Sequence, residues 1–98
     1  MFNSQVIKET EDFCIAVEER EGTLFVHVEV ENYSKGVHKE MKGVMEDLGK
    51  EAWILGWDEI YAYTPNPKFC RMMCNCQEIG EVDDHNVKVM VWHLEPQL

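Results

Sequence analysis

The sequence predicts a mixed α/β (α+β) domain built on one sheet, and two patterns carry that prediction. Apolar and polar residues alternate in several short segments, as they do in half-buried strands. Between these segments, one stretch repeats apolar residues every three or four positions, as an amphipathic helix does. Because 98 residues make only one hydrophobic core, we expect a single domain over residues 1–98, in which residues 1–11 form a polar N-terminal segment.

The predicted elements follow in the order β-β-α-β-α-β-β. Residues 12–19 and 24–30 alternate strictly and read as an antiparallel hairpin. In the second strand, leucine and valines share one face, whereas Phe25, His27 and Glu29 share the other. The helix that follows connects two strands that we expect to be parallel.

The long helix is predicted to begin after Ser34, a plausible N-cap, and to stop at Gly56. Gly43 and Gly49 weaken it by up to about 1 kcal/mol each relative to alanine. Its apolar stripe consists of Val37, Met41, Val44, Met45, Leu48, Ala52 and Leu55.

The rest of the chain predicts a strand, a short helix and a closing hairpin. The strand covers residues 57–64, and the helix covers residues 65–75 with Asn66 as its cap and Pro67 at its first position. The hairpin consists of residues 77–83, the turn DDHN at 83–86, and residues 86–94.

Composition restricts the function classes. Nine Lys and Arg against nineteen Asp and Glu give a net charge of −10, which disfavours binding to a nucleic-acid backbone. The sequence shows neither a membrane span nor a signal peptide. We therefore expect an intracellular, non-membrane protein with reduced cysteines, whose acidity suits a basic partner or, as an alternative, mimicry of DNA.

The segment CRMMCNC places Cys70, Cys74 and Cys76 within seven residues. Its CxxxCxC spacing differs from the paired CxxC of zinc ribbons, although His85 or His93 could complete a metal site after folding. On a continuous helix, Cys70 and Cys74 would share one face and Cys76 another. We interpret the sulfur atoms as core filling and predict no metal, with metal or redox chemistry as the lesser alternative.

The order of elements and the segment GWDEIYAYTPNPKFCRMM (56–73) resemble the GCN5-related N-acetyltransferase (GNAT) family, and the resemblance extends over residues 13–94. In that family, a strand ends near a splay that binds pantetheine, and a helix then presents its N-terminus to the pyrophosphate of acetyl-CoA. The chain is similar to short bacteriophage members. The resemblance implies acetyl-CoA contacts at Lys35, Gly36, Val37, His38, Lys39 and Asn66.

Two departures from the family pattern bear on catalysis. The phosphate loop Q/R-x-x-G-x-G/A aligns with YSKGVH, in which Gly36 matches but Tyr33 and His38 do not. In the second helix, Met73 replaces the family's tyrosine acid, and a thioether cannot donate a proton.

Weaker candidates for the missing chemistry lie on the strands. Tyr61 or Tyr63 could replace the acid, and Glu29 or His27 could act as the base for an amine.

We therefore predict a GNAT-fold protein without catalysis that binds a protein partner, namely itself, a virion component or a host protein. Its location would be the host cytoplasm or the virion. An active acetyl-CoA-dependent N-acetyltransferase is the alternative. Lysines around the start of the long helix suit a solvated surface or a bound anion. Trp53, Trp57 and Trp92 are candidate interface anchors.

Overall fold

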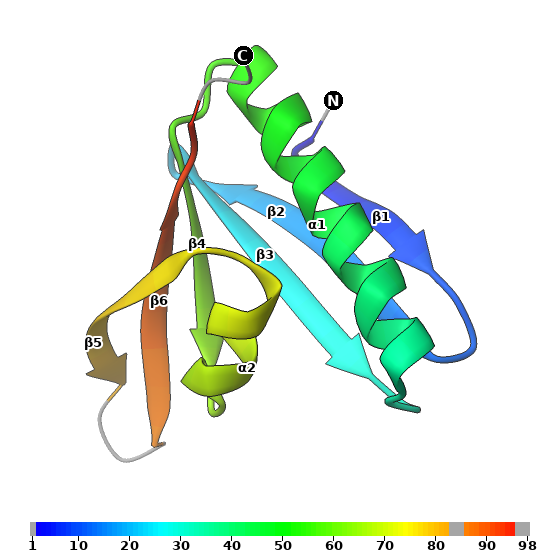
Figure 1. Ribbon diagram of the computed structural model, residues 1–98. Helices are drawn as coiled ribbons and strands as arrows, with labels where there is room; N and C mark the ends of the chain where they lie inside the picture. The colour runs from blue at the N-terminus through cyan, green and yellow to red at the C-terminus, as the bar shows by residue number, and fades with distance from the viewer. Residues whose placement is uncertain (1, 83–85, 96–98) are drawn as a thin grey trace.

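A computed structural model describes residues 2–82 and 86–95 and shows a six-stranded mixed sheet with two helices (Figure 1). The predicted mixed α+β class is confirmed. The strand order in the sheet is β1-β2-β3-β4-β6-β5. The elements are β1 (Ser4–Glu9), β2 (Phe13–Arg20), β3 (Thr23–Val30), α1 (Lys35–Ile54), β4 (Glu59–Thr64), α2 (Pro67–Met73), β5 (Cys76–Val82) and β6 (Val87–His93).

The first strand, β1, was missed by the sequence analysis, which expected only a polar segment over residues 1–11. It pairs antiparallel with β2 at the edge of the sheet, and its register shifts between Val6 and Lys8. An edge strand has a neighbouring strand on one side only, so its residues follow a weaker apolar pattern. The register shift also breaks the alternation with a period of two. The seven predicted elements therefore follow an additional N-terminal strand.

Strands β3 and β4 lie side by side in the middle of the sheet, and α1 connects them. They are parallel, as predicted, but share a single paired position, Phe25 with Tyr61. Beyond that position the two strands diverge (Figure 1). The sheet thus consists of two halves that meet at one end and separate at the other.

The main core lies between α1 and the N-terminal half of the sheet. Most of the predicted helix stripe is buried there, and Met41 and Ala52 are fully enclosed. Leu55 is an exception to the prediction: it is the C-cap residue and is 46% exposed, because the helix ends at Ile54. Ser34 is the N-cap, as predicted.

The second helix is shorter than the predicted 65–75. It begins at Pro67, as expected, and ends at Met73, so that Cys76 belongs to β5. Of the predicted turn at 83–86, residues 83–85 lie outside the described residues.

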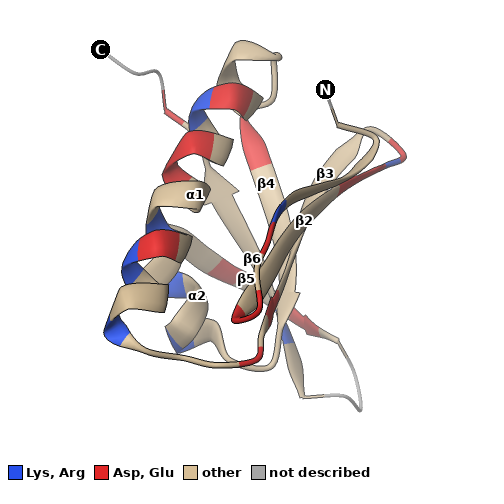
Figure 2. Ribbon diagram, turned by 90° about the vertical axis from the view of Figure 1, so that its right-hand side faces the viewer, with Lys and Arg blue, Asp and Glu red and all other residues tan. Residues whose placement is uncertain are grey.

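Both helices pack on one face of the sheet, which we call the helical face (Figures 1 and 2). The opposite face, which we call the outer face, carries no helix within the described part of the chain. Neither described helix is long and apolar enough to cross a membrane.

Candidate functional site

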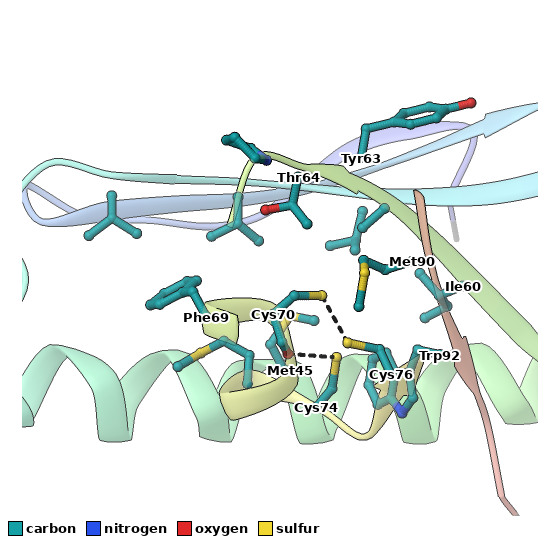
Figure 3. Close-up of a pocket in the computed structure, with 16 residues that line it drawn as sticks. Met45, Ile60, Tyr63, Thr64, Phe69, Cys70, Cys74, Cys76, Met90 and Trp92 are labelled. Atoms are coloured by element: carbon teal, nitrogen blue, oxygen red, sulfur yellow. Dashed lines mark hydrogen bonds between the residues drawn. The ribbon is translucent and has the colours of Figure 1, made fainter. Parts of the chain in front are cut away.

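A cavity of about 230 Å³ lies on the helical face where β3 and β4 separate. Both halves of the sheet contribute to its wall, and α2 covers part of it (Figure 3). Its largely apolar lining includes Val28, Val30, Ile60, Phe69, Met90 and Trp92.

Three cysteines line this cavity and form what we call the thiol cluster: Cys70, Cys74 and Cys76. Their Sγ atoms all lie within 4.8 Å of one another. The Sγ atoms of Cys70 and Cys76 are 3.0 Å apart, and the Cys74 thiol points to the Cys70 carbonyl at 3.7 Å (Figure 3).

Local structure explains the thiol cluster. Cys70 and Cys74 are four residues apart, so the helix stacks their side chains on one face. The chain then turns into β5, whose first residue, Cys76, points back at them. The prediction that Cys76 lies on a different helical face was wrong, because the helix ends before it.

The three thiols have different proton affinities. Hydrogen bonding from Cys74, helped by Cys76 and Arg71, lowers the pKa of Cys70 to about 6 despite its partial burial. The hydrogen bond to Cys70, together with burial, raises the pKa of Cys74. Burial first, and then Cys70, raises the pKa of Cys76 to about 12. Cys70 is therefore the thiol of the cluster that loses its proton most easily, and the Cys76 thiol donates to its sulfur.

The predicted phosphate loop forms an ordinary capped helix start. Ser34 Oγ accepts from the Val37 N–H at 3.2 Å, and its carbonyl accepts from the His38 N–H at 2.8 Å. Two donors that a phosphate would need are thus already used. A Cβ on Gly36 would meet only Ser34 Oγ, at 3.9 Å, so the backbone does not require glycine there.

The residues that depart from the family loop contact one another. The Tyr33 hydroxyl lies 2.6 Å from His38 Nδ1, and the Tyr33 ring meets the Phe69 ring edge-on at 5.8 Å. Asn66 caps α2 by accepting from the Phe69 N–H at 3.1 Å. Asn66 therefore reaches the same end of the molecule as the start of α1, but its amide oxygen serves the backbone.

This end of the molecule is basic. Lysines lie on the first turns of α1, and Lys68 and Arg71 lie on α2. Acidic residues are more frequent in the rest of the molecule (Figure 2). Lys35 and Lys39 are exposed and face solvent. The predicted cofactor residues are therefore brought together around an electropositive helix end.

The predicted catalytic residues lie on β3 and β4, and their side chains are on the outer face of the sheet. Tyr61 donates to Glu59 at 3.1 Å, and burial first, then Glu59, raises the pKa of its phenol. Tyr63 borders the cavity through its backbone side, but its ring points away from it (Figure 3). Glu29 is exposed beside Cys14, whose pKa is raised by burial and by nearby carboxylates. His27 Nε2 lies 3.1 Å from Glu18 Oε1, so this ring is paired with a carboxylate of the protein itself.

A ring cluster on the outer face escaped the sequence analysis. Phe25 stacks on Tyr63 with centroids 5.5 Å apart and lies 6.1 Å from Tyr61. The Arg20 guanidinium sits 5.7 Å above the Phe25 ring. Alternation had placed Phe25 on this face, but the contact with Tyr61 depends on the pairing of β3 with β4. We call Phe25, Tyr61 and Tyr63 the ring patch.

Comparison with known proteins assigns no relative: no family model matches the chain, and neither the curated proteins nor the solved structures searched contain a match.

Proposed function

We propose that this protein is a GNAT-like interaction protein that binds a protein partner through the outer face of its sheet and does not transfer acetyl groups. One observation carries the proposal. The candidate acids and bases, Glu29, Tyr61 and Tyr63, lie on the outer face, while the candidate cofactor residues surround the helix ends on the other face. A general acid must come within hydrogen-bond reach of the reacting group, and here the sheet separates the two sets.

The ring patch supports binding to a protein. Tyr63 is 51% exposed although it stacks on Phe25, so a flat aromatic surface faces solvent. Tyrosine is enriched at interface hot spots because it offers a large apolar area with a polar end. Stacking on Phe25 also holds the Tyr63 ring in one orientation before a partner binds, and this lowers the entropy lost on association.

Charge around the ring patch indicates the chemistry of the partner. Glu18 pairs with Arg20 and His27, and Glu59 lies 3.3 Å from His93, so carboxylates frame the rings. The chain carries a net charge of −10, which opposes close approach of a second copy. We infer a partner with an apolar centre and a basic rim. The resemblance to phage members suggests a virion component or a host protein as that partner.

Photo-crosslinking tests the interaction surface. A photoreactive phenylalanine at Tyr63 should form a covalent adduct with one distinct protein in the cells that make this chain. The matched control places the same residue at Ile54, which is 81% exposed but lies on α1. Adducts of equal yield at both positions, or only adducts between two copies of this chain, would contradict the proposal.

Acetyl-CoA binding is the second candidate, because the separated strands leave a cavity and lysines lie around the starts of both helices. Calorimetric titration with acetyl-CoA and with CoA decides it. Micromolar binding that is lost in Lys35→Glu and Lys39→Glu would support a cofactor site. Lys50→Glu makes the same change of charge in the C-terminal part of α1 and serves as the control. Acetyl transfer to an amine by the same sample would overturn the non-catalytic proposal.

A further inference from the structure

We propose that the thiol cluster is a binding site for a single soft metal ion, copper(I) or zinc(II), held by the Sγ atoms of Cys70, Cys74 and Cys76. The site is independent of the proposed protein interface, because it lies on the helical face and the ring patch lies on the outer face. Either proposal can therefore fail without affecting the other.

The geometry is close to what one metal ion requires. Three sulfur atoms at a zinc–sulfur distance of about 2.3 Å from one ion are about 3.8 Å apart. In this protein, no pair of these Sγ atoms is more than 4.8 Å apart, and Cys70 and Cys76 are at 3.0 Å. Side-chain movements of about 1 Å bring all three to the required spacing. Binding therefore needs no rearrangement of the backbone.

The donor set selects the class of metal. Within the described residues, the group able to hold an ion contains cysteines alone. Calcium and magnesium require oxygen ligands, whereas thiolates select copper(I) and zinc. The Met90 thioether, which is also a soft type of ligand, lines the same cavity (Figure 3). His93, once a candidate fourth ligand, lies instead beside Glu59, and His85 lies outside the described residues.

The surroundings favour ionised thiols once a cation is present. A thiol coordinates a metal ion as its thiolate, so binding of the ion releases the thiol protons of the cluster to solvent. Arg71, next to Cys70 in the chain, offsets part of the resulting negative charge. Trp92 and Phe69 in the cavity wall limit the access of water.

Metal titration of the reduced protein under nitrogen tests the site. Cobalt(II) serves as the spectroscopic probe, followed by displacement with zinc(II) and, separately, by competition for copper(I) against a chromogenic chelator. We expect one ion per chain and a thiolate-to-cobalt charge-transfer band. Competition between zinc and copper(I) shows which of the two ions the site holds more tightly.

Matched variants locate the ligands. Cys76→Ser should weaken binding at least about 100-fold, since loss of an outer-shell partner alone costs 10–100-fold. Cys14→Ser, which removes the thiol on β2, should leave the affinity unchanged. Unchanged affinity in Cys76→Ser, or no uptake of any of the three ions by the wild-type protein, overturns the proposal.

Alkylation of the wild-type protein provides a test that does not depend on the folding of variants. With zinc or copper(I) bound, iodoacetamide should label Cys14 and spare all three cysteines of the thiol cluster, as read by peptide mass spectrometry. Equal labelling of the cluster with and without the ion contradicts the site. A Cys70–Cys76 disulfide that persists in reductant and blocks uptake also contradicts it.

Discussion

The two halves of the sheet have the same plan, three strands and a helix, yet their interiors differ. In the N-terminal half, α1 has 20 residues and extends about 30 Å, enough to cover three strands. In the C-terminal half, α2 has seven residues and extends only about 10 Å. The first half is closed by tightly enclosed aliphatic residues and Phe13, whereas the second retains a cavity lined with thiols.

The difference indicates a division between stability and chemistry. A core of fully enclosed hydrocarbon gains dispersion contacts on every side and tolerates little change. A cavity beside a short helix has fewer such contacts, so it can hold polarizable groups that a ligand or an ion would use. We therefore expect substitutions in the first half to affect folding and substitutions in the second to affect reactivity.

The largest expected effect is on the first half. Leu48→Ala removes a side chain that is 1% exposed and should lower the free energy of unfolding by about 2–5 kcal/mol. Met73→Ala, in α2 beside the cavity, should cost less because its methionine already has open space on one side. Urea denaturation measures both changes in the free energy of unfolding. The control is Ile54→Ala, at an exposed position of α1, which should change this free energy by less than about 0.5 kcal/mol. An equal loss of unfolding free energy in Leu48→Ala and Met73→Ala would contradict the proposed difference between the two halves.

An intermediate effect is expected where the halves meet. A Cβ on Gly49 would lie 2.8 and 2.9 Å from two atoms of the Trp92 ring, which belongs to β6. Overpacking should cost about 1–3 kcal/mol, and the better helix propensity of alanine offsets roughly 1 kcal/mol of this. Gly49→Ala should therefore destabilise the protein by up to about 2 kcal/mol.

Gly43 provides the matched control in the same helix. No atom lies within 4 Å of the Cβ that Gly43→Ala would add, so this change should stabilise the fold by up to about 1 kcal/mol. Urea denaturation should shift the two midpoints in opposite directions. A stabilising Gly49→Ala would mean that Trp92 moves freely and that the halves are not tightly joined.

These glycines show what sequence reasoning could supply. Periodicity predicted α1, its cap and the strands that alternate, because each of those signals is local. Gly43 and Gly49 look alike in sequence, and only the packing of Trp92 distinguishes them. Likewise, β1 was missed because an edge strand imposes little pattern on its residues.

The candidate site was less predictable than the fold. The position of Cys70 relative to Cys74 follows from helical spacing, but Cys76 joins them only because α2 stops at Met73 and the chain reverses. The sequence analysis left open the side of the sheet on which Tyr63 lies. That this side is opposite the start of α1 depends on how the helices pack, which no local pattern contains.

The smallest effect on the fold, and the most specific to the second half, concerns the ionisation of Cys70. The folded protein holds the pKa of Cys70 at about 6, below the ordinary value of 9.0. Between these two pH values the folded state carries a thiolate that the unfolded chain protonates. The contribution of Cys70 to stability therefore grows as pH rises through this window and is lost as pH falls through 6.

Alkylation rates measured against pH test this directly in the metal-free protein. The rate at Cys70 should reach half its maximum near pH 6, whereas the slower rate at Cys14, whose pKa is raised, should still be increasing at pH 9. Since the hydrogen bond from Cys74 is the main cause, Cys74→Ala should move the Cys70 midpoint towards 9.0 and leave the circular dichroism spectrum unchanged. A midpoint near 9 in the wild-type protein would mean that the three sulfur atoms are ordinary core packing, and the two halves would then differ in shape but not in chemistry.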